Sequence, residues 1–324
     1  MQKMERYKKD FDAYLVEKIK TKEPRNLYDP IVYILGLGGK RIRPVLVLMA
    51  ADICGGDYRK ALDAALAIEV FHNFSLVHDD IMDDAPLRRG EETVHEKWDI
   101  NTGILSGDAM LINAYQLFEN YDGETFRELA KLFSKTAVEV CEGQQYDIDF
   151  EAREDVHIQE YLKMIEFKTA VLVGASLKMG AIVANASEEC RNQIYEYGKL
   201  LGLAFQLQDD YLDVFGDPET FGKQVGGDII ENKKTFLYLT SKHKAGKKES
   251  LQLEHLYSIN PKDTSGKVET VKNLFLSSGA AELTQLEIEK YTRMAFSVLE
   301  EMDIPEDKKA MLRLFGENLM QRQV

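Results

Sequence analysis

The sequence predicts an all-α protein, and two features of its 324 residues support this. Apolar residues recur every three or four positions through most of the chain, which is the period of an amphipathic helix. These stretches are rich in Ala, Leu, Glu, Lys and Met, which favour helices, whereas the alternation typical of strands is weak throughout. We therefore expect a single domain over residues 1–324, built as a large bundle of about ten core helices around a central cavity.

Clusters of turn-forming residues separate the stretches that predict helices. Gly, Asp, Asn and Pro gather at residues 54–57, 121–123 and 215–218, where helices should end. No Ser/Gly-rich or Pro-rich tract suggests a linker between domains. The helical periodicity is clearest over residues 59–81, 108–120, 124–142, 158–184, 188–215 and 264–301.

Composition and charge argue against several classes of protein. With a net charge of −14, the chain lacks the basic surface expected of a general nucleic-acid binder, although local basic clusters can still bind small anions. The charged N-terminal segment is unlike a signal peptide, and no apolar run approaches the roughly 18–20 residues of a membrane span. Cys54, Cys141 and Cys190 lack the spacing of a metal site and are expected to be reduced thiols. We expect a cytoplasmic protein with no nucleic-acid partner and no stable membrane insertion.

Two aspartate clusters are the most informative motifs. HDDIMDD and QLQDDYLD each follow an apolar helical stretch, and each has the pattern DDxxD, which places two carboxylates one turn apart on one helical face. Negative charge at the C-terminal end of a helix is unfavourable, so these carboxylates need a cation. Carboxylate oxygens suit hard cations such as Mg²⁺. The predicted metal ligands are Asp79, Asp80, Asp83, Asp209, Asp210 and Asp213.

Seven segments between about residues 38 and 235 carry a resemblance to a known family. In order they are GGKRIRP, HNFSLVHDDIMD, LRRG, GQQYD, FKT, FQLQDDYLD and GKQVGGDIIENKKT. Together they resemble the trans-isoprenyl diphosphate synthases, or polyprenyl synthetases, which include farnesyl and geranylgeranyl diphosphate synthases. The resemblance implies an isoprenoid-synthase-type bundle, a homodimer and a short-chain enzyme. It also implies about three Mg²⁺ ions per active site, with Mn²⁺ as a substitute.

Basic residues cluster around the aspartates, where diphosphate substrates would need cationic partners. By the resemblance, the residues that hold isopentenyl diphosphate are Lys40, Arg43, His72 and Arg89. Those that meet the allylic diphosphate are Arg88, Lys168, Lys223 and Lys233. His72 lies two helical turns before Asp79 on almost the same face, so its spacing agrees with this role.

The last basic segment departs from the family pattern. The family often has Glu-Gly-Lys before its final threonine, whereas this chain has Glu231-Asn232-Lys233. Asn accepts left-handed backbone better than most residues, so the loop can be kept. Either Lys233 or Lys234 is then the ligand.

The reaction implied by the resemblance needs no nucleophile–base pair, and none stands out. The allylic carbon–oxygen bond ionises while metal ions neutralise the departing diphosphate, and the double bond of isopentenyl diphosphate attacks the cation. Lys168-Thr169 and Gln206 match positions that face this cation. The catalytic candidates are Asp79, Asp80, Asp83, Lys168, Thr169, Gln206, Asp209 and Asp210.

Product length is limited in the family by the helix that carries the first cluster. Phe74 lies about 7.5 Å below Asp79 along the axis, where an aromatic forms a floor, and Phe71 lies about one turn further. Ser75 is small, whereas some farnesyl synthases have aromatics at the positions of both Phe74 and Ser75. Ser75, however, falls nearly under Asp79, and Phe71 and Phe74 could be ordinary core residues. The starter can be dimethylallyl, geranyl or farnesyl diphosphate, and the product has fifteen or twenty carbons.

Two other functions fit parts of the pattern. A class I terpene cyclase also has an aspartate-rich helix, but its second metal motif usually carries Asn or Asp, Ser or Thr, and Glu in place of a second DDxxD. A non-catalytic or regulatory subunit of a synthase would be expected to lose aspartates or basic residues, and both sets are complete here.

Overall fold

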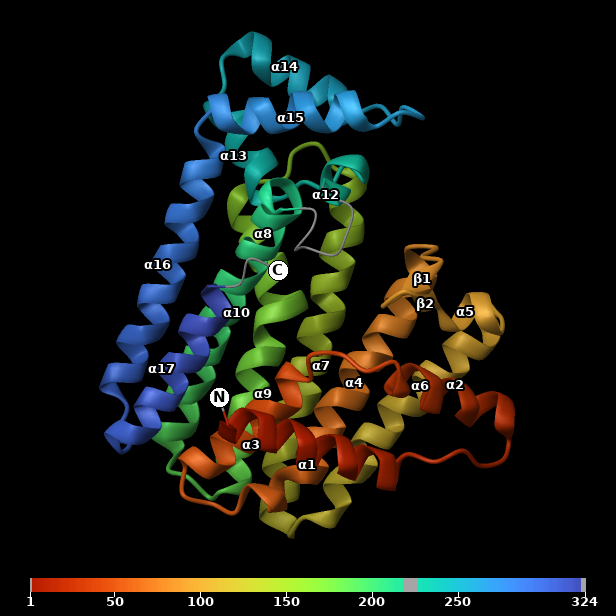
Figure 1. The fold of residues 1–324 in the computed structure, drawn as a ribbon, viewed down its shortest axis with the longest axis vertical. Coiled ribbons are helices and arrows are strands. Elements are labelled where there is room, and N and C mark those ends of the chain that lie inside the picture. Colours follow the sequence, from red (N-terminus) through yellow and green to blue (C-terminus); the bar gives the residue numbers. More distant parts are fainter. Residues whose placement is uncertain (1, 218–225, 322–324) are drawn as a thin grey trace. The chain divides into compact units, whose positions relative to one another are not determined.

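The computed structural model describes residues 2–217 and 226–321, which form helices, loops and one two-stranded ribbon (Figure 1). The predicted all-α class is confirmed. The chain divides into two compact units, the first with residues 1–134 and 175–192 and the second with residues 135–174 and 193–324. This division describes packing, so the single-domain expectation stays a prediction.

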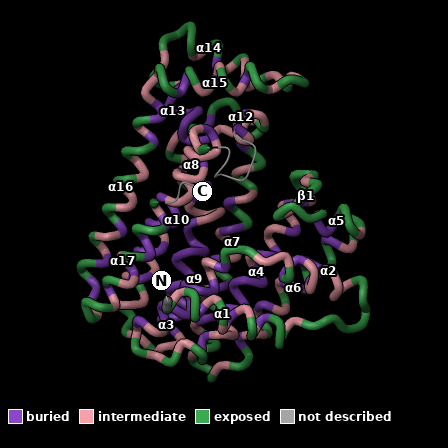
Figure 2. Tube along the Cα trace, in the orientation of Figure 1, coloured by how far each residue is buried: buried purple, intermediate pink, exposed green. Residues whose placement is uncertain are grey.

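The first unit is built around α4 (Leu62–Met82), which packs against α2, α3 and α6. Because α4 has neighbours on several sides, most of its residues from Ala64 to Phe74 are buried and nearly all of them are apolar (Figure 2). The other elements of this unit are α1 (Gln2–Lys18), α2 (Arg25–Gly36), α3 (Ile42–Ile53), η1 (Tyr58–Ala61), β1 (Leu87–Arg88), β2 (Glu91–Glu92), α5 (Val94–Lys97), α6 (Ile100–Gln116) and η2 (Leu117–Asn120).

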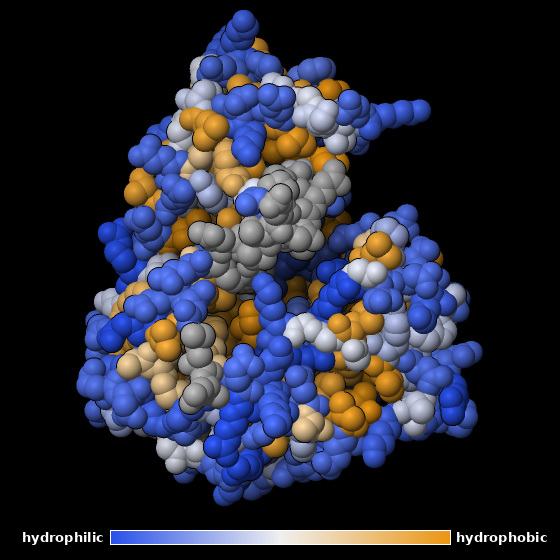
Figure 3. All heavy atoms as spheres, viewed as in Figure 1, coloured by the Kyte–Doolittle hydropathy of each residue, from blue (hydrophilic) through white to orange (hydrophobic). Residues whose placement is uncertain are grey.

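The second unit is built around α13 (Phe236–Lys244), which packs against α8, α14, α15 and α16. The outward faces of α14 and α15 are mainly hydrophilic (Figure 3). Its other helices are α8 (Ile158–Ile165), η3 (Glu166–Ala170), α12 (Gly227–Ile230), α14 (Lys247–Leu256), α15 (Ser265–Ser277), α16 (Ala280–Glu301) and α17 (Glu306–Met320). Three helices have residues in both units: α7 (Gly123–Ala152), α9 (Val171–Val183) and α10 (Glu188–Phe215).

Several element boundaries differ from those expected. The periodic stretch 264–301 is two helices, because Gly279 has a left-handed backbone (φ 76°) that ends α15 before α16 begins. The stretch 158–184 is interrupted by η3, a π-helical turn. The β1–β2 ribbon was not expected, since two residues per strand are too few to show alternation. None of the described helices combines the length and the apolar character needed to cross a membrane.

Candidate active site

A pocket of about 360 Å³ in the first unit brings together all four residues expected to hold isopentenyl diphosphate. Lys40 and Arg43 come from the start of α3, His72 from α4, and Arg89 from the turn between β1 and β2. Segments that are distant in sequence thus place these three cations and an imidazole around one cavity, which Arg41 and Glu69 also line. This composition suits a ligand with several negative charges.

His72 is neutral in this pocket. Arg43 Nη1 lies 3.2 Å from His72 Nε2, and because arginine only donates hydrogen bonds, Nε2 is the acceptor and Nδ1 carries the proton. Burial lowers the pKa of His72 well below its usual value, and the guanidinium groups of Arg43 and Arg89 lower it further. His72 therefore presents a hydrogen-bond donor without adding a charge.

The glycines of GGKRIRP let Arg89 lie directly against the loop that precedes α3. Gly39 has φ +126°, and a Cβ at this position would lie 3.1 Å from Arg89 Cζ. Arg89 Nη1 donates a hydrogen bond to the carbonyl oxygen of Gly38. A larger residue at position 39 would therefore strain the loop and displace Arg89.

Arg41, between Lys40 and Arg43 in sequence, has a structural role. Its guanidinium is buried and donates hydrogen bonds of 2.6 Å to Glu69 Oε1 and to the carbonyl oxygen of Leu35. Glu69 is a buried residue of α4, so the pair joins the start of α3 to α4. Sequence reasoning missed Glu69, although a single acidic residue inside the apolar stretch AALAIEVF was a usable signal.

The first aspartate cluster lies where α4 ends. Asp83 donates its backbone N–H to the carbonyl oxygen of Asp79 at 2.8 Å, so the two residues are one turn apart, as the spacing predicted. The chain then turns away, because Asp84 adopts a left-handed backbone and the N–H of Ala85 bonds to the carbonyl oxygen of Asp80 at 2.9 Å.

Asp80 has the geometry of a cation ligand. Its side chain is buried, and Oδ1 accepts a hydrogen bond of 3.0 Å from Arg88 Nε. The other oxygen, Oδ2, is buried with no hydrogen-bond partner among the residues that the structure describes. Burial raises the pKa of Asp80, and Arg88 opposes that change. A buried carboxylate oxygen in this position is suited to a metal ion.

The β1–β2 ribbon gives two adjacent arginines different partners. Arg88 lies on β1 and pairs with Asp80, whereas Arg89 lies in the turn and reaches the pocket beside Gly39. The sequence assigned both residues to diphosphates, but in this structure the partner of Arg88 is an aspartate.

A second pocket, of about 110 Å³, lies in the second unit. It contains five of the residues predicted from sequence: Lys168, Thr169, Gln206, Asp210 and Lys233. Lys234, the alternative to Lys233, also lines it, together with five polar residues that were not predicted: Asp147, Glu151, Tyr161, Asp228 and Thr235. Asp147 and Asp228 belong to the GQQYD and GKQVGGDIIENKKT segments, so the signal was present in the motifs.

Hydrogen bonds connect most of the polar side chains of this pocket. Lys168 Nζ lies 2.5 Å from Asp147 Oδ2. Thr169 Oγ1 donates to Gln206 Oε1 at 3.0 Å, and Gln206 Nε2 donates to Asp210 Oδ1 at 2.9 Å. The hydroxyl of Tyr161 donates to the other oxygen of Asp210. Asp210 is thereby held on both oxygens.

Lys168 and Thr169 lie on η3, which is packed very closely against α7. A Cβ at Gly143 of α7 would lie only 2.2 Å from the backbone nitrogen of Lys168, so only glycine permits this approach. Asp147 follows Gly143 by one turn on the same face of α7 and so meets the Lys168 side chain. The first residue of GQQYD therefore allows the contact that the last residue makes.

The second aspartate cluster makes this region strongly acidic. Burial raises the pKa of Asp210 to about 7, and the charges of Asp209 and Asp147 raise it as well. The pKa of Asp228 is also raised, by burial and by Asp210 and Asp213. Asp213 Oδ2 accepts the backbone N–H of Asp228 at 3.0 Å. Such a group of carboxylates favours either protons or a bound cation.

The two candidate lysines have different surroundings. Lys234 Nζ donates to the carbonyl oxygens of Phe150 and Glu151, near the C-terminal end of α7, at 2.7 and 3.1 Å. Lys233 Nζ lies 3.1 Å from Glu231 Oε2. Burial alone would lower the pKa of Lys233, but the charges of Glu231, Asp147 and Asp228 raise it above its usual value. Asn232 has φ 59°, the left-handed backbone that its type permits. Lys223 lies outside the described residues.

The three residues expected to limit product length lie in the first unit. Phe71 is fully buried and packs edge-on against Phe133 at 5.1 Å between ring centroids. Phe74 is also buried and contacts Phe71 at 5.6 Å and His78 at 4.8 Å. Ser75 is partly buried and donates to the carbonyl oxygen of His72 at 2.8 Å. Phe71 thus belongs to an aromatic core, whereas Phe74 lies nearer to the aspartates.

Known proteins resemble the chain over most of its length. The polyprenyl synthetase family model matches residues 24–275. A geranylgeranyl diphosphate synthase of Methanosarcina mazei is 39% identical over 274 residues, which cover 82% of this chain and 85% of the relative. A crystal structure of a geranylgeranyl pyrophosphate synthase is 54% identical with a TM-score of 0.95, and the match covers 99% of each chain.

A third similar protein was solved with ligands. It is a geranylgeranyl pyrophosphate synthase from Corynebacterium glutamicum in complex with isoprenyl diphosphate and magnesium. It is 26% identical to this chain with a TM-score of 0.84, and the match covers 98% of this chain and 97% of that one. From the family match, these relatives and the fold, we conclude that the chain is a prenyltransferase and belongs to the polyprenyl synthetase family.

Proposed function

We propose that this prenyltransferase joins isopentenyl diphosphate to an allylic diphosphate and makes all-trans farnesyl or geranylgeranyl diphosphate. One observation carries the proposal: the four residues expected to hold isopentenyl diphosphate line a single pocket of the first unit. The names of the Methanosarcina and Corynebacterium relatives support a short product.

Lys40, Arg43 and Arg89 would bind the diphosphate of isopentenyl diphosphate by charge-assisted hydrogen bonds. His72 would donate its Nδ1–H, since Arg43 occupies the Nε2 side of the ring. Because the Arg43–His72 and Arg89–Gly38 contacts already hold these side chains in place, little ordering is needed when the substrate binds.

Magnesium fits the two aspartate clusters. The residues that would hold it are Asp79, Asp80, Asp83, Asp209, Asp210 and Asp213, and the buried Oδ2 of Asp80 is a ready ligand atom. When bound, about three Mg²⁺ ions, or Mn²⁺ in their place, supply Lewis-acid neutralisation of the leaving diphosphate. The magnesium in the Corynebacterium relative supports this assignment.

The polar residues of the second unit would act on the allylic substrate. Lys168 and Lys233 line the same pocket and would bind the allylic diphosphate. The family resemblance adds Lys223 and, from the first unit, Arg88 to this role. We assign this role to Lys233 rather than Lys234, because Lys234 already bonds to two carbonyl oxygens of α7. The Gln206 and Thr169 oxygens, positioned by their mutual hydrogen bond, would stabilise the developing allylic cation.

Steady-state kinetics with separately varied substrates test this division. Arg43→Ala should raise KM for isopentenyl diphosphate by roughly 10- to 100-fold, the usual cost of one charge-assisted contact, and leave KM for the allylic substrate nearly unchanged. Lys168→Ala should raise KM for the allylic substrate or lower kcat. Lys163→Ala, which removes a lysine of α8 that pairs with Glu166, is the matched control. If Arg43→Ala leaves KM for isopentenyl diphosphate unchanged, the assignment is wrong.

We further propose a homodimer, with α6 in its interface. Ile104, Leu105 and Ile112 of α6 are 41%, 59% and 58% exposed, which is unusual for large apolar side chains on one helix. A second copy of the chain would cover them. The cytoplasmic location stays a prediction from the sequence. The terpene cyclase and non-catalytic alternatives are not favoured, since the chain belongs to a synthase family and keeps both aspartate clusters.

A further inference from the structure

Two cysteines that are 136 residues apart in sequence lie side by side in the first unit. Cys54 Sγ and Cys190 Sγ are 3.8 Å apart, which is van der Waals contact between thiols. Both side chains are partly exposed, so small molecules can reach them. The third cysteine, Cys141, lies elsewhere, on α7.

Each thiol occupies a well-defined position at a helix end. Cys54 is the residue at which α3 ends, and its N–H bonds to the carbonyl oxygen of Ala50 at 3.0 Å. Cys190 lies in the first turn of α10, where its N–H donates to Ser187 Oγ at 3.2 Å. Each backbone N–H is therefore held by a hydrogen bond to its own helix end.

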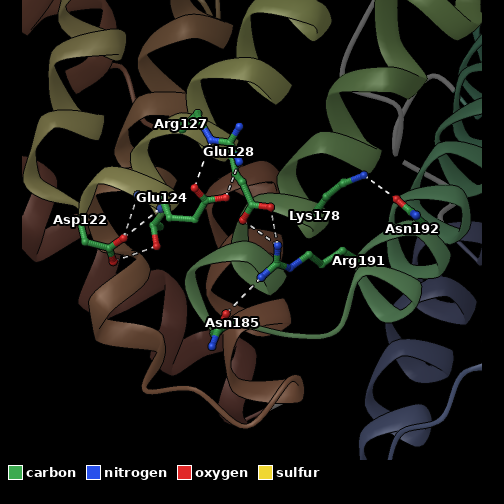
Figure 4. Close-up of polar contacts among 9 residues, drawn as sticks. Asp122, Glu124, Arg127, Glu128, Lys178, Asn185, Arg191 and Asn192 are labelled. Atoms are coloured by element: carbon green, nitrogen blue, oxygen red, sulfur yellow. Dashed lines mark hydrogen bonds and ion pairs between the residues drawn. The ribbon is translucent and has the colours of Figure 1, made fainter.

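The segments that carry the cysteines are also held from outside. Figure 4 shows Arg191, the next residue of α10, reaching Glu128 of α7 and Asn185, and Lys178 of α9 reaching Asn192. The Arg191–Glu128 contact is 2.6 Å. A Cβ at Gly56, just after Cys54, would lie 2.9 Å from Ala184 Cβ, so the end of α3 packs tightly against the end of α9. These contacts keep the two sulfurs adjacent.

We propose that Cys54 and Cys190 form an oxidative modification site. A small disulfide such as oxidised glutathione would oxidise the two thiols to an intramolecular disulfide. One protein thiolate attacks a glutathione sulfur and releases one glutathione thiolate. The second protein thiolate then attacks the protein sulfur of the mixed disulfide and releases the other glutathione thiolate. Two protein thiols are oxidised and one small disulfide is reduced to two thiols. Bond formation shortens the sulfur–sulfur distance from 3.8 Å to about 2.05 Å.

This bond would stabilise the first unit and leave the pocket intact. Arg43 lies at the opposite end of α3 from Cys54, roughly 16 Å away at 1.5 Å per residue. Cys190 is likewise at the end of α10 opposite to Gln206 and Asp209. Oxidation should therefore raise Tm by roughly 5–10 °C, because it closes a long loop, while activity changes less than twofold.

The test uses the full-length chain, reduced, freed of reductant and incubated with oxidised glutathione. The thiols of Cys54 and Cys190 should both be lost, whether the exposed Cys141 stays a thiol or takes up glutathione, and peptide mapping should find a Cys54–Cys190 link that dithiothreitol reverses. Cys141→Ser should keep the link and the Tm shift, whereas Cys54→Ser and Cys190→Ser should lose both.

Three results would overturn the proposal: no linked peptide, a link only through Cys141, or stable glutathione adducts at Cys54 or Cys190 that never close. The thiol count and the map are made on the wild-type chain, so the answer does not depend on a variant that folds. They also need no substrate and therefore stand apart from the proposed function.

Discussion

Arg41 Nη1 lies 2.6 Å from Glu69 Oε1, and the two side chains are each only 4% exposed. The pair connects the residue before α3 to the middle of α4, and both residues line the pocket that contains Lys40 and Arg43. The stability of the first unit and the shape of the pocket therefore depend on the same contact.

Removing one member of this pair should destabilise the protein strongly. Arg41→Met would leave the Glu69 carboxylate buried without its main partner, which costs about 3–5 kcal/mol in free energy of unfolding. Glu69→Gln should cost less, because the amide oxygen still accepts from Arg41. Urea unfolding measures both, with Arg127→Ala as the control, since Arg127 pairs with Glu124 on the surface. Equal stability of Arg41→Met and the wild type would exclude a structural role for the pair.

Activity should depend on a divalent metal. Excess chelator should abolish turnover, and Mg²⁺ or Mn²⁺ should restore it. Asp79→Ala and Asp209→Ala should each lower kcat by orders of magnitude and keep the helical circular dichroism spectrum. Asp303→Ala, outside both clusters, serves as the control. Full turnover in excess chelator would rule out the metal assignment.

The stability of the metal-free protein should depend on pH because of Asp210. Its folded pKa is raised to about 7, above the unfolded value, so between about pH 4 and 7 the native state binds more protons than the unfolded state. The contribution of Asp210 to stability is therefore present at low pH and lost as pH rises through 7. Asp210→Asn, whose side chain cannot ionise, should not lose this stability as pH rises.

Relative to the wild type, Asp210→Asn should gain on the order of 1–4 kcal/mol between pH 4 and pH 8, since one pKa unit is worth about 1.4 kcal/mol. Denaturant unfolding in chelator at several pH values measures the difference. Asp155→Asn is the control, because Arg153 lowers the pKa of that exposed carboxyl, so it titrates mainly below pH 4 and its difference from the wild type should change little up to pH 8. A pH-independent difference between Asp210→Asn and the wild type would show that Asp210 stays ionised.

Phe74 should limit the length of the product. Phe74→Ala opens space just below the first aspartate cluster, and products should shift toward longer chains with little effect on the first condensation. Adding Phe71→Ala should lengthen them further, and Ser75→Phe should shorten them. Product chromatography with each allylic starter measures the distribution.

Folding of Phe74→Ala must be checked in parallel, since emptying a buried Phe site costs roughly 3–5 kcal/mol. Phe118→Ala, which truncates an aromatic of the same unit that packs on Phe133, controls for cavity formation alone. If Phe74→Ala folds and its products match those of the wild type, Phe74 is an ordinary core residue.

Local sequence patterns predicted the features that depend on neighbours along the chain. The helical period predicted the all-α class, and the DDxxD spacing predicted that Asp79 and Asp83 lie one turn apart. Short motifs also identified Lys40, Arg43, His72 and Arg89, which the fold brings to one pocket. Short elements were missed, because neither the two-residue strands nor the turn at Gly279 interrupts the hydrophobic period for long enough.

The amino-acid sequence by itself thus determined the helical class and the family, and it named several of the polar residues that line the two pockets. Only the tertiary structure decided which side chains meet: Asp147 with Lys168, Arg88 with Asp80, Glu69 with Arg41, and Cys54 with Cys190. The reason is physical. Helix period and capping act over a few residues, whereas these partners lie 8 to 136 positions apart and meet only when the chain folds.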